Sequence, residues 1–419
     1  MAERVSTDEV VAFRLRAHHL LDRLDEGGLL DAVASCAVQN SPPGSALLAL
    51  HARARGVTTE LLHHAVGVEK LLMQTWCMRG APFHVPTADA YAFTTGVLPP
   101  TEETMRHLVP GAVSAVDRLG ITLTAAVDLT GVEIGPVLSG RRLDINELGA
   151  ELAERIAPRL SRSQRDIWQE EGAYAAGQPL GQAVVHFCLR ILALRGVVCL
   201  APRAGNRAPF VLVDEWLGHP IPDIDPDVAR VELLRRYLHC YGPSGRADFA
   251  AWLGIRAADT DPWWNLVTDE LTPVEFRGTS WMLTEDLPIL RSGQMPTGVR
   301  LLPPHDPYTQ LRDRDTIVDK TYQPLVWKSA GDPGSILVDG RIIGIWRPRK
   351  SDRRLTITVT TLVRLPGRTR SMLQEEAEQL APLRGASSVD VEFSTLTSPI
   401  GASLAREESP DARPRWTPS

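Results

Sequence analysis

The chain of 419 residues is poor in lysine and has no long apolar segment. Only four of its 45 basic residues are lysines, which leaves 41 arginines. No apolar run approaches the roughly 20 residues that a membrane-spanning helix needs, so we expect no membrane segment. Acidic residues precede the first apolar stretch, and the layout of a secretory signal is missing. These absences predict a cytoplasmic protein.

Patterned cysteines and paired metal ligands are missing as well. The five cysteines (Cys36, Cys77, Cys188, Cys199 and Cys240) are odd in number and contain no C-x-x-C pair. Such spacing predicts neither a zinc site nor a disulfide framework, and we expect buried, inert thiols. The adjacent histidines His18 and His19 point to different faces of a helix, which is a poor arrangement for a metal. We therefore expect no metal and no organic cofactor.

The common enzyme motifs are absent too. G-x-x-x-x-G-K-[ST], H-E-x-x-H and G-x-S-x-G do not occur, so nucleotide hydrolysis, zinc proteolysis and α/β-hydrolase chemistry have no support. A net charge of −6 and a pI of about 6.0 argue against nucleic-acid binding by total charge alone. The arginine excess suits phosphate recognition, although a GC-rich genome would produce the same excess without any function. The distribution of charge is therefore more informative than its sum.

Helical segments followed by short hairpins recur along the chain. In 101–218, helices lead into two apolar strands around the basic turn 203–207, which is the order of a winged helix. The range 219–295 repeats this order around the turn 277–279. An Asp-Gly turn at 339–340 and the alternating run 355–363 indicate strands in the last part. We predict an α+β protein with tandem winged-helix domains and a C-terminal β-rich, barrel-like region.

The predicted domain boundaries follow these composition changes. They are 1–100 for a first winged-helix-like domain, 101–218 and 219–295 for the second and third winged-helix domains, 296–400 for the β-rich domain, and 401–419 for a disordered tail.

A basic segment lies between two predicted strands of the last domain. Residues 347–354 carry five positive charges (Arg347, Arg349, Lys350, Arg353 and Arg354) against one negative charge. A basic hairpin of this kind can follow phosphates or enter a groove of DNA. The alternative is a solvated loop whose charges only keep a sheet edge soluble.

Gln39 stands where a helix gives way to a Pro-Pro-Gly turn. Its amide can both donate and accept hydrogen bonds, and Asn40 and Ser41 add polar groups beside it. Such a glutamine can hold a water molecule or an extruded base. It can equally cap or stabilise the turn, and the residues alone leave both interpretations open.

Several stretches occur in the order found in one known family. They are Ala37-Val38-Gln39-Asn40-Ser41-Pro42-Pro43-Gly44 with Ala49-Leu50-His51-Ala52-Arg53, then Trp76-Cys77-Met78-Arg79-Gly80-Ala81 with His84, Leu302-Pro303-Pro304-His305-Asp306-Pro307-Tyr308 with Arg314, and Val338-Asp339-Gly340-Arg341-Ile342-Ile343-Gly344-Ile345-Trp346-Arg347. Over nearly its whole length, the chain resembles the AlkZ/YcaQ-type winged-helix DNA glycosylases.

The resemblance implies a monofunctional DNA glycosylase that removes N3- or N7-alkylated purines from double-stranded DNA, including bulky or crosslinked natural-product adducts. Its biological role would be DNA repair or self-resistance to a genotoxin. The protein would act as a monomer without a cofactor, associated with the nucleoid. Catalysis would fall to Gln39 and Asn40, with Asp306 as another source of the second polar group. DNA contacts would come from Arg53, Arg79 and the basic hairpin Arg347, Arg349, Lys350, Arg353 and Arg354.

One position departs from the family motif. The family has glutamine, an apolar residue, and then glutamine or aspartate, whereas this chain has Ala37, Val38 and Gln39. Ala37 favours an alternative in which the chain is a non-catalytic winged-helix DNA-binding protein, either a regulator or an inactive paralogue. A third possibility is a protein-interaction scaffold, which would show no salt-dependent DNA affinity.

Overall fold

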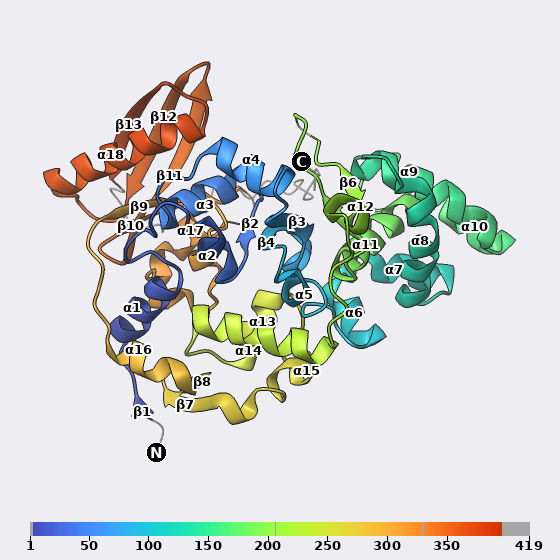
Figure 1. Ribbon diagram of the computed structural model, residues 1–419, viewed down its shortest axis with the longest axis horizontal. Coiled ribbons are helices and arrows are strands. Elements are labelled where there is room, and N and C mark those ends of the chain that lie inside the picture. Colours follow the sequence, from blue (N-terminus) through green and yellow to red (C-terminus); the bar gives the residue numbers. More distant parts are fainter. Residues whose placement is uncertain (1–2, 206, 329–330, 396–419) are drawn as a thin grey trace. The chain divides into compact units, whose positions relative to one another are not determined.

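In the computed structural model, the chain folds into two compact units, and residues 3–205, 207–328 and 331–395 are described (Figure 1). The predicted tail at 401–419 lies outside the described residues. Of the described residues, the first unit comprises those within 3–62, 235–248 and 268–395, and the second comprises most of 63–267. Helices α4 (Thr59–Gly67), α13 (Pro226–Tyr241) and α14 (Arg246–Leu253) contain residues of both. The boundaries predicted from the sequence stay a prediction.

The first unit contains two sheets and the helices packed on them. Its elements are β1 (Glu3–Arg4), α1 (Thr7–Ala17), α2 (Leu29–Ala34), β2 (Val38–Gln39), α3 (Ser45–Arg53), β7 (Leu271–Glu275), β8 (Thr279–Leu283), α16 (Leu287–Arg291), β9 (Val299–Leu302), α17 (Gln323–Val326), β10 (Gly334–Val338), β11 (Arg341–Ser351), β12 (Arg354–Thr361), α18 (Gly367–Leu383) and β13 (Ser388–Thr395).

Local sequence explains where the first helices begin. Ser6 and Glu9 form a capping box at α1, in which the Glu9 carboxylate accepts the Ser6 backbone N–H at 2.8 Å. Helix α3 is buried on nearly all sides, which agrees with its apolar sequence and places it in the core of the unit. Strands β1, β7 and β8 form a small sheet in that order.

The larger sheet has the order β13-β12-β11-β10-β9. Its neighbouring strands are antiparallel except β12 and β13, which run parallel and are connected through α18. Figure 1 shows α18 lying along this sheet, and its apolar residues pack on the inner face of β12. The Asp-Gly turn between β10 and β11 is confirmed, with φ of 45° at Asp339 and 79° at Gly340.

The barrel-like form expected for this region is wrong within the described residues. Strands β9 and β13 stand at opposite edges of an open sheet, and no pairing joins them there. The core instead closes on one face, where the Trp346 indole donates to the Leu302 carbonyl at 2.8 Å. Gly334 permits this packing, because a Cβ atom there would lie 2.2 Å from the Trp346 ring. A helix covers the face that a barrel would have enclosed.

The second unit is mainly helical and includes the predicted hairpin. Strands β4, β3, β5 and β6 follow one another in that order, and β5 pairs with β6 antiparallel. The elements are β3 (Leu72–Trp76), β4 (Pro82–Pro86), α5 (Ala90–Phe93), α6 (Glu102–Leu108), α7 (Pro110–Leu119), α8 (Leu123–Leu138), α9 (Ile145–Ile156), α10 (Arg162–Trp168), α11 (Leu180–Leu194), β5 (Val198–Leu200), β6 (Phe210–Leu212), α12 (Val213–Leu217) and α15 (Asp261–Trp264).

No single helix in the described part of the chain is long and apolar enough to cross a membrane. Helices α7 and α8 reach that length and composition only as a pair, and they are bent by 92° relative to each other.

Candidate active site and basic hairpin

Gln39 ends the short strand β2, six residues before the central helix α3 of the first unit begins at Ser45. Its residue is 8% exposed, and its backbone carbonyl accepts the Ser45 hydroxyl at 3.1 Å. The backbone before it bends sharply, because Ala37 adopts a left-handed φ of 60°. Among the described residues, the structure gives the Gln39 side-chain amide no hydrogen-bond partner. This amide therefore keeps both its donor and its acceptor for another molecule.

Asn40 has a structural task at the same place. Its side-chain oxygen accepts the backbone N–H of Gly44 at 2.9 Å and that of Ala46 at 3.5 Å. These contacts satisfy N–H groups at the start of α3, where Gly44 itself provides no side-chain cap. Asn40 thereby fixes the turn that follows Gln39, and its oxygen is already occupied.

Arg53, expected to contact DNA, is buried at the other end of α3. It is 1% exposed, and its guanidinium donates to both Asp306 carboxylate oxygens at 2.7 and 2.8 Å. Burial by itself would lower the pKa of Arg53, but the Asp306 carboxylate raises it above its ordinary value. The structure directs the Arg53 donors to Asp306 in the protein interior, and the DNA contact at Arg53 stays a prediction.

The pairing joins two of the motifs that carry the family resemblance. Asp306 is 1% exposed and also accepts the Tyr308 backbone N–H at 3.0 Å, which begins a short 3-10 turn at Pro307–Gln310. Its carboxylate oxygens are thus used by Arg53 and by the turn. Asp306 holds the loop in place and is poorly suited to supply a second catalytic group.

A second buried arginine was missed at the sequence level. Arg14, 1% exposed, donates to both carboxylate oxygens of Asp313 and to the carbonyls of Gly242 and Pro243. It is one of several helical residues within an apolar stretch, and nothing in its spacing distinguishes it from an exposed arginine. Its partners lie 228 to 299 residues away along the chain.

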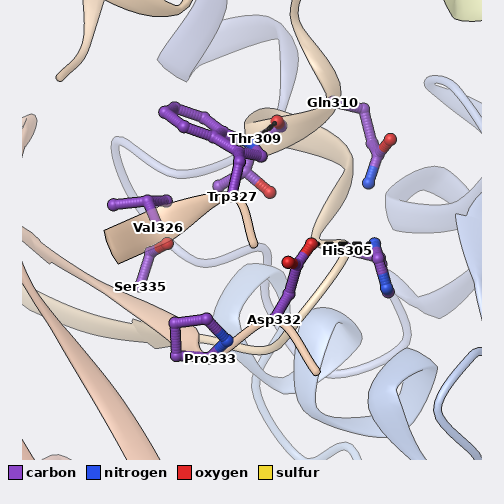
Figure 2. Close-up of a pocket in the computed structure, with 8 residues that line it drawn as sticks. All are labelled: His305, Thr309, Gln310, Val326, Trp327, Asp332, Pro333 and Ser335. Carbon is purple, nitrogen blue, oxygen red and sulfur yellow. Dashed lines mark hydrogen bonds and ion pairs between the residues drawn. The ribbon is translucent and has the colours of Figure 1, made fainter. Parts of the chain in front are cut away.

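A small polar pocket lies beside the Asp306 loop. His305 and Asp332 face each other there, with 3.6 Å between Nδ1 and Oδ2 (Figure 2). Thr309, Gln310, Trp327 and Ser335 also line the pocket, which encloses about 10 Å³. That space suits one water molecule and is far too small for a nucleobase.

The basic segment forms a long, regular hairpin instead of a loop. Strand β11 continues to Ser351 and β12 begins at Arg354, so only Asp352 and Arg353 make the turn. Arg347 pairs across the ladder with Thr358, and Arg349 pairs with Thr356. Because alternate residues of a strand share a face, Arg347, Arg349 and Arg354 lie on one outer face.

The five basic side chains of the hairpin differ in their surroundings. All are exposed. Lys350 is on the opposite face, which α18 covers, and it lies near Gly385 at the edge. Arg347 donates to the Gly331 carbonyl at 3.0 Å, while Arg354 forms an ion pair with Asp390. The structure therefore brings together three of the five charges on one surface.

Arg79 belongs to the second unit. It adopts a left-handed φ of 56°, its guanidinium donates to the Trp252 carbonyl, and its Cζ lies 6.0 Å from the centre of the Phe83 ring. A DNA contact would have to compete with the hydrogen bond to Trp252.

The site thus combines a buried glutamine, whose side-chain amide is unengaged among the described residues, with an exposed basic hairpin that can contact phosphates. The family described as DNA glycosylase AlkZ-like matches residues 34–383, and the chain belongs to this family of DNA glycosylases. It is 27% identical over 398 residues to the interstrand DNA cross-link repair glycosylase of Streptomyces sahachiroi, covering 93% of this chain and 99% of that protein. The solved structure of the Streptomyces sahachiroi DNA glycosylase AlkZ is similar with a TM-score of 0.71 at 25% identity, covering 93% of this chain and 100% of that one.

Proposed function

We propose that this chain is a monofunctional DNA glycosylase that hydrolyses the N-glycosidic bond of N3- or N7-alkylated purines in double-stranded DNA. The observation that carries the proposal is the Gln39 side chain, which is buried at the end of β2 and whose amide is unengaged among the described residues. Family membership supports DNA as the partner. The relative's cross-link repair supports bulky or crosslinked natural-product adducts as substrates, in DNA repair or self-resistance.

The reaction needs little acid catalysis. Alkylation makes the purine cationic, so cleavage of the C1′–N bond releases a neutral base and leaves positive charge on the sugar. A water molecule then attacks C1′ and loses its proton to solvent. In the proposed site, the side-chain carbonyl of Gln39 accepts a hydrogen bond from this water. The dipole of the same carbonyl faces the developing positive charge on the sugar. Asn40 keeps Gln39 in position by fixing the turn before α3.

The outer face of the β11–β12 hairpin is the proposed DNA contact. Arg347 and Arg349 protrude there, and Arg353 stands at the turn. Regular pairing with β12 holds the backbone that carries Arg347 and Arg349 in place, which a mobile loop would not do. Arg79 and Lys350 are proposed as weaker DNA contacts. Arg79 is already hydrogen-bonded to the Trp252 carbonyl, and Lys350 lies on the face of the hairpin that α18 covers.

We also propose that 101–218 and 219–295 are winged-helix modules. Helices α8, α9 and α11 pack on one another and precede the β5–β6 hairpin, which supports the first of these assignments. The β7–β8 hairpin, which turns at Arg277 and Gly278, supports the second. A monomeric protein in the cytoplasm, associated with the nucleoid, is part of the same proposal.

A single-turnover excision assay tests the chemistry. Duplex DNA that carries N7-methylguanine or a natural-product-alkylated guanine is incubated with excess protein and then treated with alkali, which cleaves abasic sites. We expect Gln39→Ala to lower the excision rate by about 10²–10³-fold while DNA binding persists. Gln169→Ala, an exposed glutamine of the second unit, is the matched control and should excise normally. Unchanged excision in Gln39→Ala would remove this residue from the site.

Ala37 favours a second candidate, a non-catalytic DNA-binding protein. The same assay distinguishes the two, because a binding protein shifts the duplex but leaves no alkali-labile site on either lesion. Binding by itself is tested by the double reversal Arg347→Glu and Arg349→Glu, which should weaken affinity and lower the salt slope by about 1 for each lost phosphate contact. The control is a reversal of Arg162 and Arg165, which are exposed on α10 and change the net charge equally. Equal affinity in the two double variants would exclude the hairpin face.

A further inference from the structure

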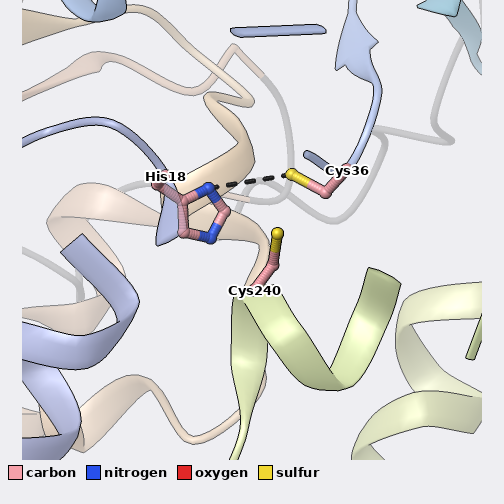
Figure 3. Close-up of side chains that lie close together, drawn as sticks. All are labelled: His18, Cys36 and Cys240. Atoms are coloured by element: carbon pink, nitrogen blue, oxygen red, sulfur yellow. Dashed lines mark hydrogen bonds between the residues drawn. The ribbon is translucent and has the colours of Figure 1, made fainter. Parts of the chain in front are cut away.

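Three buried side chains with metal-binding chemistry meet in the core of the first unit. His18 ends α1, Cys36 follows α2, and Cys240 belongs to α13 (Figure 3). Their exposed fractions are 1%, 5% and 0%, and their ligand atoms all lie within 4.8 Å of one another. Segments separated by up to about two hundred residues thus place two thiols and one imidazole around a single point.

The hydrogen bonds of this cluster are incomplete. Cys36 Sγ lies 3.7 Å from His18 Nδ1, while His18 Nε2 is buried without a partner among the described residues. A buried polar nitrogen without a partner costs about 1–3 kcal/mol, so native structures seldom leave one unused. These groups are arranged for a cation more than for inert packing.

We propose that His18, Cys36 and Cys240 bind one thiophilic metal ion, with Zn²⁺ as the expected occupant. For tetrahedral zinc, Zn–S of about 2.3 Å and Zn–N of about 2.0–2.1 Å place sulfur and nitrogen about 3.6 Å apart. The observed 3.7 Å separation of Cys36 Sγ and His18 Nδ1 is close to that value. The remaining ligand separations, at most 4.8 Å, need shifts of about 1 Å to reach tetrahedral geometry.

Charge also favours a divalent ion. Two thiolates and a neutral imidazole balance the charge of Zn²⁺, so the filled site carries no net charge in the core, and binding releases two thiol protons. The nearby Arg53 is already neutralised by Asp306. The Ser35 carbonyl accepts a hydrogen bond from the Cys240 thiol at 3.3 Å. Either this carbonyl or a water molecule would supply the fourth ligand of the ion.

The ion would be structural, and its position would matter for the candidate active site. Cys36 precedes Gln39 by three residues, and the left-handed Ala37 lies between them. A metal that joins α1, the end of α2 and α13 would hold this strained turn. The sequence led us to expect no metal, because the three ligands are far apart along the chain.

Metal analysis of the full-length protein tests the site directly. We expect about one zinc ion per chain after purification without chelators, or after incubation with Zn²⁺ and dialysis. Replacement by Co²⁺ should produce the near-ultraviolet thiolate charge-transfer band and the visible bands of tetrahedral cobalt. Cys36→Ser, Cys240→Ser and His18→Gln should each lose most of the bound metal. Cys188→Ser, a buried cysteine of the second unit, should keep it.

Circular dichroism and DNA binding of each variant distinguish loss of ligand from loss of fold. Metal loss in a folded Cys240→Ser variant, with Cys188→Ser unaffected, supports the site. Protein that holds no zinc or cobalt and titrates all five thiols would overturn it, as would a Cys36–Cys240 disulfide found by mass spectrometry. Because the readout is metal content, failure here leaves the glycosylase proposal standing, and loss of excision alone leaves the metal site standing.

Discussion

Breaking the ion pair between Arg53 and Asp306 would decide whether Arg53 supports the fold or contacts DNA. The guanidinium makes two bonds to the carboxylate, at 2.7 and 2.8 Å, and a third to the Ala49 carbonyl at 2.8 Å. Removing one partner of a buried pair leaves an uncompensated charge and costs about 3–5 kcal/mol. We expect Asp306→Asn to lower the free energy of unfolding by this amount, a large part of a typical total of about 5–15 kcal/mol.

A double variant separates the electrostatic part from the loss of packing. Arg53→Met removes the charge but keeps a long apolar side chain, and combined with Asp306→Asn it leaves no unpaired charge in the core. The cost in the double variant should therefore be smaller than the sum of the two single costs by about 2–3 kcal/mol. Urea unfolding followed by tryptophan fluorescence, supported by circular dichroism, measures all four proteins under the same conditions.

The salt dependence of DNA binding in the same variants supplies the second measurement. If Arg53 faces the core, the folded Arg53→Met protein should bind DNA with an unchanged salt slope, as should the exposed control Arg162→Met. A phosphate contact would instead lower the slope by about 1. A stability loss below about 1 kcal/mol together with a lower slope would refute the buried-pair argument and return Arg53 to the DNA-binding surface.

Three further predictions concern the Gln39 turn and the buried histidines. Asn40→Ala removes the oxygen that caps α3 and should lower the free energy of unfolding, measured in urea, by about 1 kcal/mol. The same change at Asn146, which is exposed on α9, should lower it by less. Equal losses in the two variants would argue against the cap. Ala37→Gly should leave the free energy of unfolding unchanged within about 1 kcal/mol. Ala37→Gln should lower it by about 1–3 kcal/mol, because the larger side chain overpacks the core, and it should not speed excision. Faster excision in Ala37→Gln would identify position 37 as a catalytic position that this chain has lost. Burial lowers the pKa of His51, His84 and His186 to about 4 from an ordinary 6.5. Their contribution to the free energy of unfolding is therefore complete above pH 6.5. Between pH 6.5 and 4, where the unfolded chain binds the protons more readily, each histidine should lower this free energy by about 1.4 kcal/mol per pH unit. Urea midpoints at pH 7.5 and 5 measure that loss, and equal midpoints would contradict it.

Features set by neighbouring residues were predictable from the sequence. The Asp-Gly turn at Asp339 and Gly340 lies where it was expected, because both residues tolerate a left-handed backbone. Helix α13 begins at Pro226 and ends at Tyr241, as its proline and the following Gly-Pro pair predict. The motifs also led to the family, which the comparisons confirm.

Features set by distant residues were not predictable in the same way. Arg53 looks like any helical arginine until Asp306, 253 residues later, is placed beside it. The parallel strand β13 depends on the chain returning over α18 to pair with β12, and its alternating sequence does not indicate which strand it pairs with or in which direction. The sequence predicted a basic hairpin, with a solvated loop as the alternative, but not that β11 and β12 pair regularly as far as Ser351 and Arg354. The pairing and burial of these residues depend on tertiary contacts, which cannot be predicted from the residues next to them in the sequence.

Ala37 illustrates how a departure from a family motif can follow from backbone geometry. Its N–H donates to the Val33 carbonyl at 3.0 Å, which closes the end of α2 with a left-handed residue and turns the chain into the strand that carries Gln39. The residue is 1% exposed, so a side chain as long as glutamine would need room that the packed core does not provide. A site built on one glutamine lacks a strong acid and a second water-orienting group. In the proposed reaction it therefore suits bases whose alkylation has already made them good leaving groups, and it would leave undamaged purines intact because their neutral bases need protonation to depart.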